Sequence, residues 1–175
     1  MATVNQTPAT ESTLSAEHLE ILGRYGTERD VAAGDILFAP GDADYDLPVV
    51  LSGVVEVVGG TADQPVVVAS MEPGSFVGEF GMITGQRAYM TARVREAGRV
   101  MIIPNASVRH ILDREGEVAD IILAAFIARR RILRLDLAGA ATIRVYGSRY
   151  APGALALRGF LARSNVPHRW VDLDE

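Results

Sequence analysis

The stretch of residues 27–104 constrains the fold of this 175-residue chain more than any other part of the sequence. Short runs of Val, Ile, Leu and Phe recur along it, and turn-forming pairs such as Gly34-Asp35, Gly41-Asp42 and Gly59-Gly60 separate them. Short strands with turn signals at this spacing are typical of an all-β sandwich or barrel. The expected strands cover residues 35–38, 47–51, 54–58, 66–69 and 100–103.

The residues before this stretch have a different character. Residues 1–13 are polar and almost uncharged, which predicts a flexible tail. Residues 14–23 show a helical pattern of apolar side chains, and Thr13 or Ser15 can cap that helix. We therefore expect one domain over residues 14–137, mainly β with flanking α-helices.

Two helices are expected after Pro104. Asn105 or Ser107 can cap the first. After a break at Gly116, residues 117–137 repeat apolar side chains at the spacing of an amphipathic helix. More than one turn of this long helix is almost entirely apolar, which exceeds what contact with one small barrel requires.

One segment carries an informative order of chemical groups. Gly78 allows a tight turn, Glu79 supplies a carboxylate, a short apolar stretch follows, and Arg87 precedes the next strand. A helix beginning near Gly78 or Glu79 would direct unpaired backbone N–H groups at an anion. Arg87 could bind the same anion through two parallel hydrogen bonds, and Glu79 could accept from a sugar hydroxyl. The alternative is a surface turn with a solvated Glu and a solvated Arg.

This segment resembles the phosphate-binding cassette of cyclic nucleotide-binding domains, the family of bacterial catabolite activators and kinase regulatory subunits. The residues that match the family pattern are Phe76, Gly78, Glu79, Met82 and Arg87-Ala88. The resemblance implies that Glu79 binds the ribose 2′-hydroxyl and that Arg87 binds the phosphate. It also implies that Ala88, standing where Ser or Thr favours cyclic GMP, favours cyclic AMP. The predicted ligand-binding residues are Gly78, Glu79, Phe80, Arg87, Ala88 and Tyr89.

Two earlier motifs resemble the same family and extend the likeness to about residues 14–136. Residues 34–42 are similar to its entry hairpin, and residues 49–57 are similar to its V-x-x-G-x-[VA]-x-[VL] hairpin. The implied fold is a jelly-roll β-barrel with a long C-terminal helix that covers the nucleotide and often pairs with its twin across a dimer axis. The expected dimer face is Ile121, Ala124, Ala125 and Ala128. Packing of this apolar surface against the chain's own C-terminal segment is the alternative.

The last part of the chain has the pattern of one βαβ unit, residues 143–175, after a linker over residues 138–142. Strands are expected at residues 142–146 and 168–173, and Pro152 fits the first turn of the helix between them. A unit of this size is too small to bury its own sheet.

This unit resembles the start of a glutaredoxin or thioredoxin-like domain through Val145-Tyr146-Gly147, Val166-Pro167 and Val171-Asp172. Ala151 and Ala154 stand at its two cysteine positions, so the redox role does not carry over. The whole arrangement is similar to the N-terminal part of a bacterial subfamily in which these regions precede a flavin-dependent, thioredoxin-reductase-like oxidoreductase. That resemblance implies a flavin reductase domain as a partner, in cis or in trans, and a chain that ends before it.

Composition excludes several other functions. The net charge of −5 and the absence of cysteine argue against nucleic acid, an anionic membrane surface and thiolate metal sites as partners. The basic residues 129–131 and Arg134 are interleaved with apolar ones, which indicates a solvated or intersubunit ion-pairing face, with binding to a nucleic-acid backbone as the alternative. No signal peptide is visible, so a cytoplasmic location is expected.

No catalytic spacing surrounds the three scattered histidines, and no cofactor or metal motif occurs. We therefore expect a regulatory cyclic-nucleotide-binding module and no enzyme in this chain. A degenerate fold that serves as a dimerisation or docking scaffold without nucleotide is the alternative.

Overall fold

The computed structural model describes residues 13–61, 64–139, 143–163 and 168–174. The chain divides into two compact units, Met1–Phe126 and Ile127–Glu175. The elements in order are α1 (Ala16–Leu22), β1 (Thr27–Val31), β2 (Ile36–Phe38), β3 (Leu47–Thr61), β4 (Gln64–Met71), α2 (Glu79–Thr84), β5 (Thr91–Ile103), α3 (Asn105–Arg114), α4 (Gly116–Gly139), β6 (Ile143–Gly147), α5 (Pro152–Arg163) and β7 (His168–Asp172).

The division between the units falls inside α4, and the expected domain limits at residues 14–137 and 143–175 stay a prediction. Residues 1–12 of the expected tail and residues 140–142 of the expected linker lie outside the described residues.

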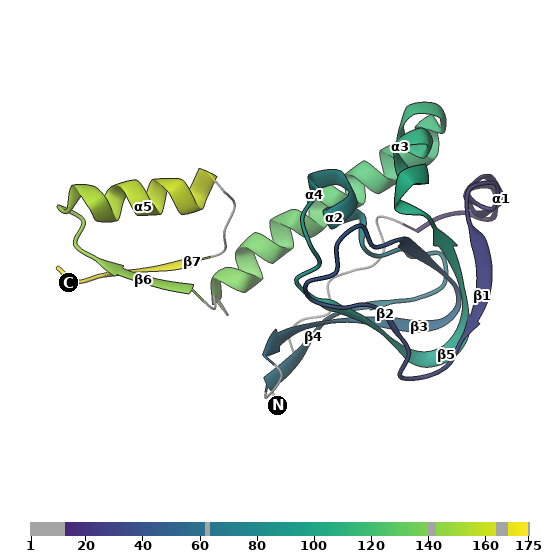
Figure 1. The fold of residues 1–175 in the computed structure, drawn as a ribbon, viewed down its shortest axis with the longest axis horizontal. Coiled ribbons are helices and arrows are strands. Elements are labelled where there is room, and N and C mark those ends of the chain that lie inside the picture. The colour runs from purple at the N-terminus through teal and green to yellow at the C-terminus, as the bar shows by residue number, and fades with distance from the viewer. Residues whose placement is uncertain (1–12, 62–63, 140–142, 164–167, 175) are drawn as a thin grey trace. The chain divides into compact units, whose positions relative to one another are not determined.

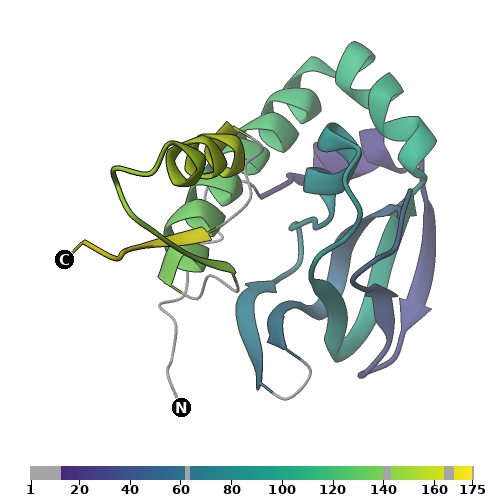
Figure 2. The ribbon, with the colours of Figure 1, turned by 60° about the vertical axis from the view of Figure 1, so that its left-hand side comes forward.

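The first unit is built on an antiparallel sheet with the strand order β1-β5-β3-β4, and β2 also pairs with β5. Figure 1 shows this sheet curving, with α1, α2 and α3 along one side of it, and the turned view in Figure 2 agrees. The prediction of a mainly β fold with flanking helices is confirmed.

β3 differs from the prediction, because it is one continuous strand of 15 residues and not a hairpin turning at Ser52-Gly53. The expected break at Gly59-Gly60 also lies within this strand. Gly53 has a φ of +79°, and a Cβ there would lie 2.5 Å from the carbonyl oxygen of Glu96. Opposite it, a Cβ on Gly98 would overlap the carbonyl of Ser52. The glycines therefore mark a bulged crossing of β3 and β5, and not a turn.

Two clusters of buried side chains stabilise the first unit. The strand-side cluster consists of Val31, Phe38, Val50, Val55, Val57, Met71, Val77, Ala88, Ala92, Val94 and Val100. The helix-side cluster consists of Leu14, Leu22, Leu47, Val49, Phe76, Met101, Ile103, Val108, Ile111, Val118, Ile122 and Ala125. Val49 and Val50 fall in different clusters because successive side chains of a strand point to opposite faces.

The helix starts show one prediction that holds and one that does not. Ser15 caps α1 by accepting the His18 N–H at 3.2 Å, and the His18 side chain in turn accepts the Ser15 N–H. At α3 neither predicted cap is used, because the N-cap position is Pro104 and has no side-chain bond. The carboxylate of Asp46, 59 residues earlier, accepts the Asn105 N–H at 3.1 Å instead.

α4 buries part of the surface that was expected to face a second copy. Ala125 is fully buried in the helix-side cluster with Val118 and Ile122, so Ala125 is not available for a dimer contact. Leu123, on a different side of the helix, is 40% exposed. None of the described helices is long and apolar enough to span a membrane.

The second unit contains a parallel pair of strands, β6 and β7, with α5 lying along one face of the pair in Figure 1. Val145 and Leu161 are buried there, and the Arg158 guanidinium lies 5.6 Å from the centre of the Trp170 ring. Several large apolar side chains of this unit are exposed, namely Tyr146, Tyr150, Leu155, Leu157, Phe160 and Leu173. The likeness of the unit to glutaredoxin stays a prediction, and Val166-Pro167 lies outside the described residues.

Candidate functional site

The segment that leads into the candidate site is attached to β3 by backbone hydrogen bonds. Residues 74–77 run antiparallel to residues 48–50, with N–H to O distances of 2.8 Å from Gly74 to Val50, 2.8 Å from Val50 to Ser75 and 3.1 Å from Val77 to Pro48. Phe76, which is fully buried, points into the helix-side cluster, and Val77 points into the strand-side cluster. The entry to the site is therefore fixed by both parts of the core.

A left-handed turn then places a carboxylate at the start of a short helix. Gly78 has a φ of +104°, which favours glycine, and α2 begins at the next residue. The predicted helix start near Gly78 or Glu79 is confirmed. Glu79 is only 4% exposed, so its carboxylate is not the solvated group of a surface turn. Gly85, with a φ of +68°, ends the helix by donating its N–H to Gly81 at 2.7 Å.

Arg87 and Ala88 lie against the turn that follows β2. The Arg87 guanidinium is exposed and donates from Nη1 to the Gly41 carbonyl at 2.7 Å. Ala88 is buried, accepts the Gly41 N–H at 2.7 Å and donates its own N–H to the Asp42 carbonyl at 2.9 Å. Since the Gly41 bond uses one of the five donors of the guanidinium, the remaining donors can serve an anion.

Two tyrosines lie close to the Glu79 carboxylate. Burial raises the pKa of the Tyr45 phenol, a hydrogen bond from Gly81 lowers it in part, and the charge of Glu79 raises it. Tyr89 is only partly buried, and this partial burial raises the pKa of its phenol, with smaller contributions from Tyr45 and Glu79. Both phenols therefore stay neutral at physiological pH and can offer hydrogen bonds beside a negative group.

The structure groups the predicted residues around the start and the end of α2. Gly78 and Glu79 form its start, while Arg87 and Ala88 follow its end; Tyr89 is 42% exposed. The side chain of Phe80 lies outside the described residues, although its backbone is part of α2.

Gly41 and Tyr45 were missed as site residues by the sequence reasoning. The sequence indicated Gly41 only as part of a turn. Its bond to Arg87 uses the backbone carbonyl, which every residue has, so the residue type gives no signal of it. Tyr45 is a single aromatic residue between two aspartates, in a connection without periodicity. Its isolation among acidic residues was the one available signal.

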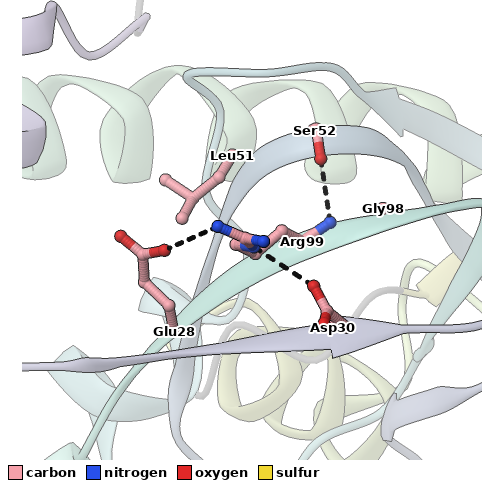
Figure 3. Close-up of a pocket in the computed structure, with 6 residues that line it drawn as sticks. All are labelled: Glu28, Asp30, Leu51, Ser52, Gly98 and Arg99. Atoms are coloured by element: carbon pink, nitrogen blue, oxygen red, sulfur yellow. Dashed lines mark hydrogen bonds and ion pairs between the residues drawn. The ribbon is translucent and has the colours of Figure 1, made fainter.

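A separate hollow of about 460 Å³ lies where β1, β3 and β5 meet, lined by Glu28, Asp30, Leu51, Ser52, Gly98 and Arg99 (Figure 3). Arg99 binds Asp30 at 3.1 Å and Glu28 at 3.5 Å, and its backbone N–H donates to Ser52. These ion-paired side chains are each more than half exposed. Their charges are already matched with one another in solvent, so we interpret the hollow as a solvated ion-pair cluster.

The chemistry available at the cassette is that of binding. A buried carboxylate at the start of α2 can accept from hydroxyl groups, and an exposed guanidinium shortly after its end can bind an anion. Among the described residues there is no group of three or more His, Asp or Glu side chains placed to hold a metal ion. A ligand with neighbouring hydroxyl and anionic groups fits this combination.

Comparison with known protein families gives a match over the same region. The family model described as "Cyclic nucleotide-binding domain" matches residues 28–115, which is half of the chain and includes β1 to α3. No curated protein sequence matches the chain significantly.

Solved structures show the same fold at low sequence identity. The chain superposes on Thermus thermophilus catabolite activator protein with a TM-score of 0.61, 22% identity and coverage of 73% of this chain and 61% of that one. The c-di-GMP-responsive global regulator CLP of Xanthomonas campestris gives a TM-score of 0.59 and 22% identity, with coverage of 71% of this chain and 65% of that one. A protein from a cyclic-GMP-dependent signalling pathway of bacterial phytopathogenesis gives a TM-score of 0.56 and 22% identity, with coverage of 67% of this chain and 94% of that one. The match spans less than two thirds of each of the first two proteins.

Proposed function

The chain belongs to the cyclic nucleotide-binding domain family, and we propose that it is a regulatory module that binds cyclic AMP between Glu79 and Arg87. In this proposal the Arg87 guanidinium pairs with the cyclic phosphate, and Glu79 accepts a hydrogen bond from the ribose 2′-hydroxyl. Gly78, Phe80, Ala88 and Tyr89 complete the ligand-binding set.

The burial of Glu79 is the observation that carries the proposal. A carboxylate that is only 4% exposed is held in place by the fold and can accept a hydrogen bond at a fixed position. Glu79 lies within the region that the family model matches, and the resemblance of its segment to the family's phosphate-binding cassette supports a role for it in binding the ribose. Its seat at the start of α2, with Arg87 just beyond the helix, supports the pairing of a hydroxyl with a phosphate.

The choice of cyclic AMP rests on Ala88, which offers no hydroxyl to a guanine base. Related folds include proteins described as responsive to c-di-GMP and to cyclic GMP, so these are the competing ligands. We expect calorimetric titration of the chain to give saturable binding with cyclic AMP and weaker binding with cyclic GMP and c-di-GMP. Tighter binding of either competitor would replace the ligand in this proposal.

A scaffold that binds no nucleotide is the second candidate, and the bulk of Tyr89 beside Ala88 favours it. Ligand that binds the native state must raise its thermal midpoint by mass action. A folded chain whose midpoint does not move with any of the three nucleotides would establish the scaffold.

We also propose that two copies associate through α4. Leu123 and Ile127 of this helix are 40% and 67% exposed, respectively, and Ala124 is exposed as well, which supports an apolar contact surface. Sedimentation equilibrium is expected to give a dimer, and Leu123→Glu is expected to give a monomer because it would bury two charges at the contact. A wild-type chain that sediments as a monomer at all concentrations contradicts this proposal.

The role of the second unit is proposed to be docking or attachment to a flavin-dependent reductase. The parallel pair β6–β7, the exposed Tyr146 of β6 and the exposed Phe160 of α5 support a unit that packs against further structure. The native gene product, purified intact, is then expected to show flavin absorbance or to change the NADPH oxidation rate of such a reductase when cyclic AMP is added. If neither signal is observed, the reductase is removed from the proposal.

A further inference from the structure

Tyr45, in the connection between β2 and β3, touches the start of α2 through its hydroxyl group. The Tyr45 hydroxyl accepts the backbone N–H of Gly81 at 3.1 Å. This N–H is one of the donors that the first turn of any helix leaves without an internal partner. The N-cap residue, Gly78, has no side chain to accept it, so Tyr45 supplies the cap from another part of the chain.

The residues around the Tyr45 ring leave room for it only because two of them are glycines. A Cβ on Gly81 would overlap the Tyr45 hydroxyl and come within 2.6 Å of Cζ. Gly81 does not have a positive φ, so backbone conformation does not explain a glycine that costs about 1 kcal/mol relative to alanine inside a helix. The ring also lies on Phe38, with centroids 4.5 Å apart, and a Cβ on Gly78 would press on both rings. The close approach of Tyr45, together with that of the Gln86 carbonyl oxygen at 2.8 Å, leaves no room for a side chain at position 81.

The segment that carries Tyr45 also holds the other end of the candidate site. Its Gly41 carbonyl accepts from Arg87, and Gly41 and Asp42 exchange backbone hydrogen bonds with Ala88. One connection therefore fixes both ends of the candidate site. Tyr45 holds the helix that begins with Glu79, and Gly41, four residues before Tyr45, holds the guanidinium of Arg87. The spacing between the carboxylate and the cation depends on this segment.

We propose that Tyr45 is a positioning residue for the candidate site, which holds Glu79 at the distance from Arg87 that one rigid ligand requires. This inference rests on the proposed function. The 2′-hydroxyl and the phosphate of a 3′,5′-cyclic nucleotide belong to fused rings, so their separation cannot adapt to the protein. Loosening of α2 by loss of the Tyr45 hydroxyl therefore weakens the Glu79 contact specifically.

The test compares cyclic AMP with 2′-deoxy-cyclic AMP, which lacks the hydroxyl that Glu79 would bind. Calorimetry on the wild-type chain is expected to show a preference of about tenfold or more for cyclic AMP, the size of one hydrogen bond to a charged group. Tyr45→Phe is expected to lose most of that preference, with the affinity for 2′-deoxy-cyclic AMP almost unchanged. Tyr25→Phe removes a phenol that bonds Glu115 elsewhere in the fold, and it is expected to keep the preference.

The outcomes separate this role from the proposed function. If the wild-type chain binds neither nucleotide, the proposed function fails and the positioning role fails with it. If the wild-type chain prefers cyclic AMP and Tyr45→Phe keeps that preference, only the positioning role fails. A second measurement needs no ligand: Gly81→Ala is expected to lower the thermal midpoint in the wild type and to lower it less in a Tyr45→Ala background, where the 2.8 Å approach to the Gln86 carbonyl oxygen remains. Equal effects in both backgrounds would overturn the proposed seat of the ring.

Discussion

Replacement of Arg87 by alanine is expected to lower the affinity for cyclic AMP by roughly 30- to 1,000-fold while the chain stays folded. Removal of one partner of a hydrogen-bonded charge pair in a binding site costs about 2–4 kcal/mol, because the phosphate is left without its counter-charge. The Arg87 side chain is exposed and bonds the Gly41 carbonyl within the fold, so its removal is expected to cost little stability. Calorimetric titration with a parallel thermal melt measures both effects.

Two further variants make this result specific. Arg99→Ala removes a different exposed arginine, which is ion-paired in the hollow of Figure 3, and is expected to leave nucleotide affinity unchanged. Arg87→Lys keeps the charge but loses the two-pronged geometry, so its affinity is expected to fall between those of the wild type and Arg87→Ala. Wild-type affinity in Arg87→Ala would show that the phosphate site lies elsewhere.

Replacement of Phe76 by alanine is expected to lower the free energy of unfolding of the first unit by about 3–5 kcal/mol. Phe76 is fully buried in the helix-side cluster, and its segment pairs with β3 immediately before the Gly78 turn. Truncation therefore removes apolar contacts and leaves a cavity beside the entry to the candidate site. Chemical denaturation followed by far-ultraviolet circular dichroism measures the change.

The control for this experiment is Ile36→Ala in β2. Ile36 is 50% exposed, so its truncation is expected to cost less than about 1 kcal/mol. A cost for Phe76→Ala as small as that of Ile36→Ala would mean that the core around α2 is not packed as described.

The predictable part of this protein was the part with local chemical signals. Gly78 requires a left-handed φ, and Glu79 and Arg87 match a spaced motif, so the turn, the helix start and the candidate ligands could be placed from the sequence. Ser15 could be predicted as an N-cap in the same way, because it directly precedes the helix that it caps. In each case the residue and the group that it serves are close in sequence.

The features that escaped prediction depend on residues that are far apart in the chain. Gly53 has the sequence signal of a turn. Its close contact with the β5 segment around Gly98 makes it a bulge within β3 instead. The cap of α3 is Asp46 and the cap of α2 is Tyr45, and neither partner can be paired with its helix by local spacing. Long-range caps of this kind become visible only when the strands have brought the connections together.

The position of Trp170 gives the protein an intrinsic optical reporter. It is the only tryptophan of the chain, and it lies in β7 of the second unit beneath the Arg158 guanidinium. The candidate nucleotide site lies entirely in the first unit. Tryptophan emission therefore reports on the second unit, and a nucleotide-dependent change in emission would show that this unit senses ligand at a site in the first.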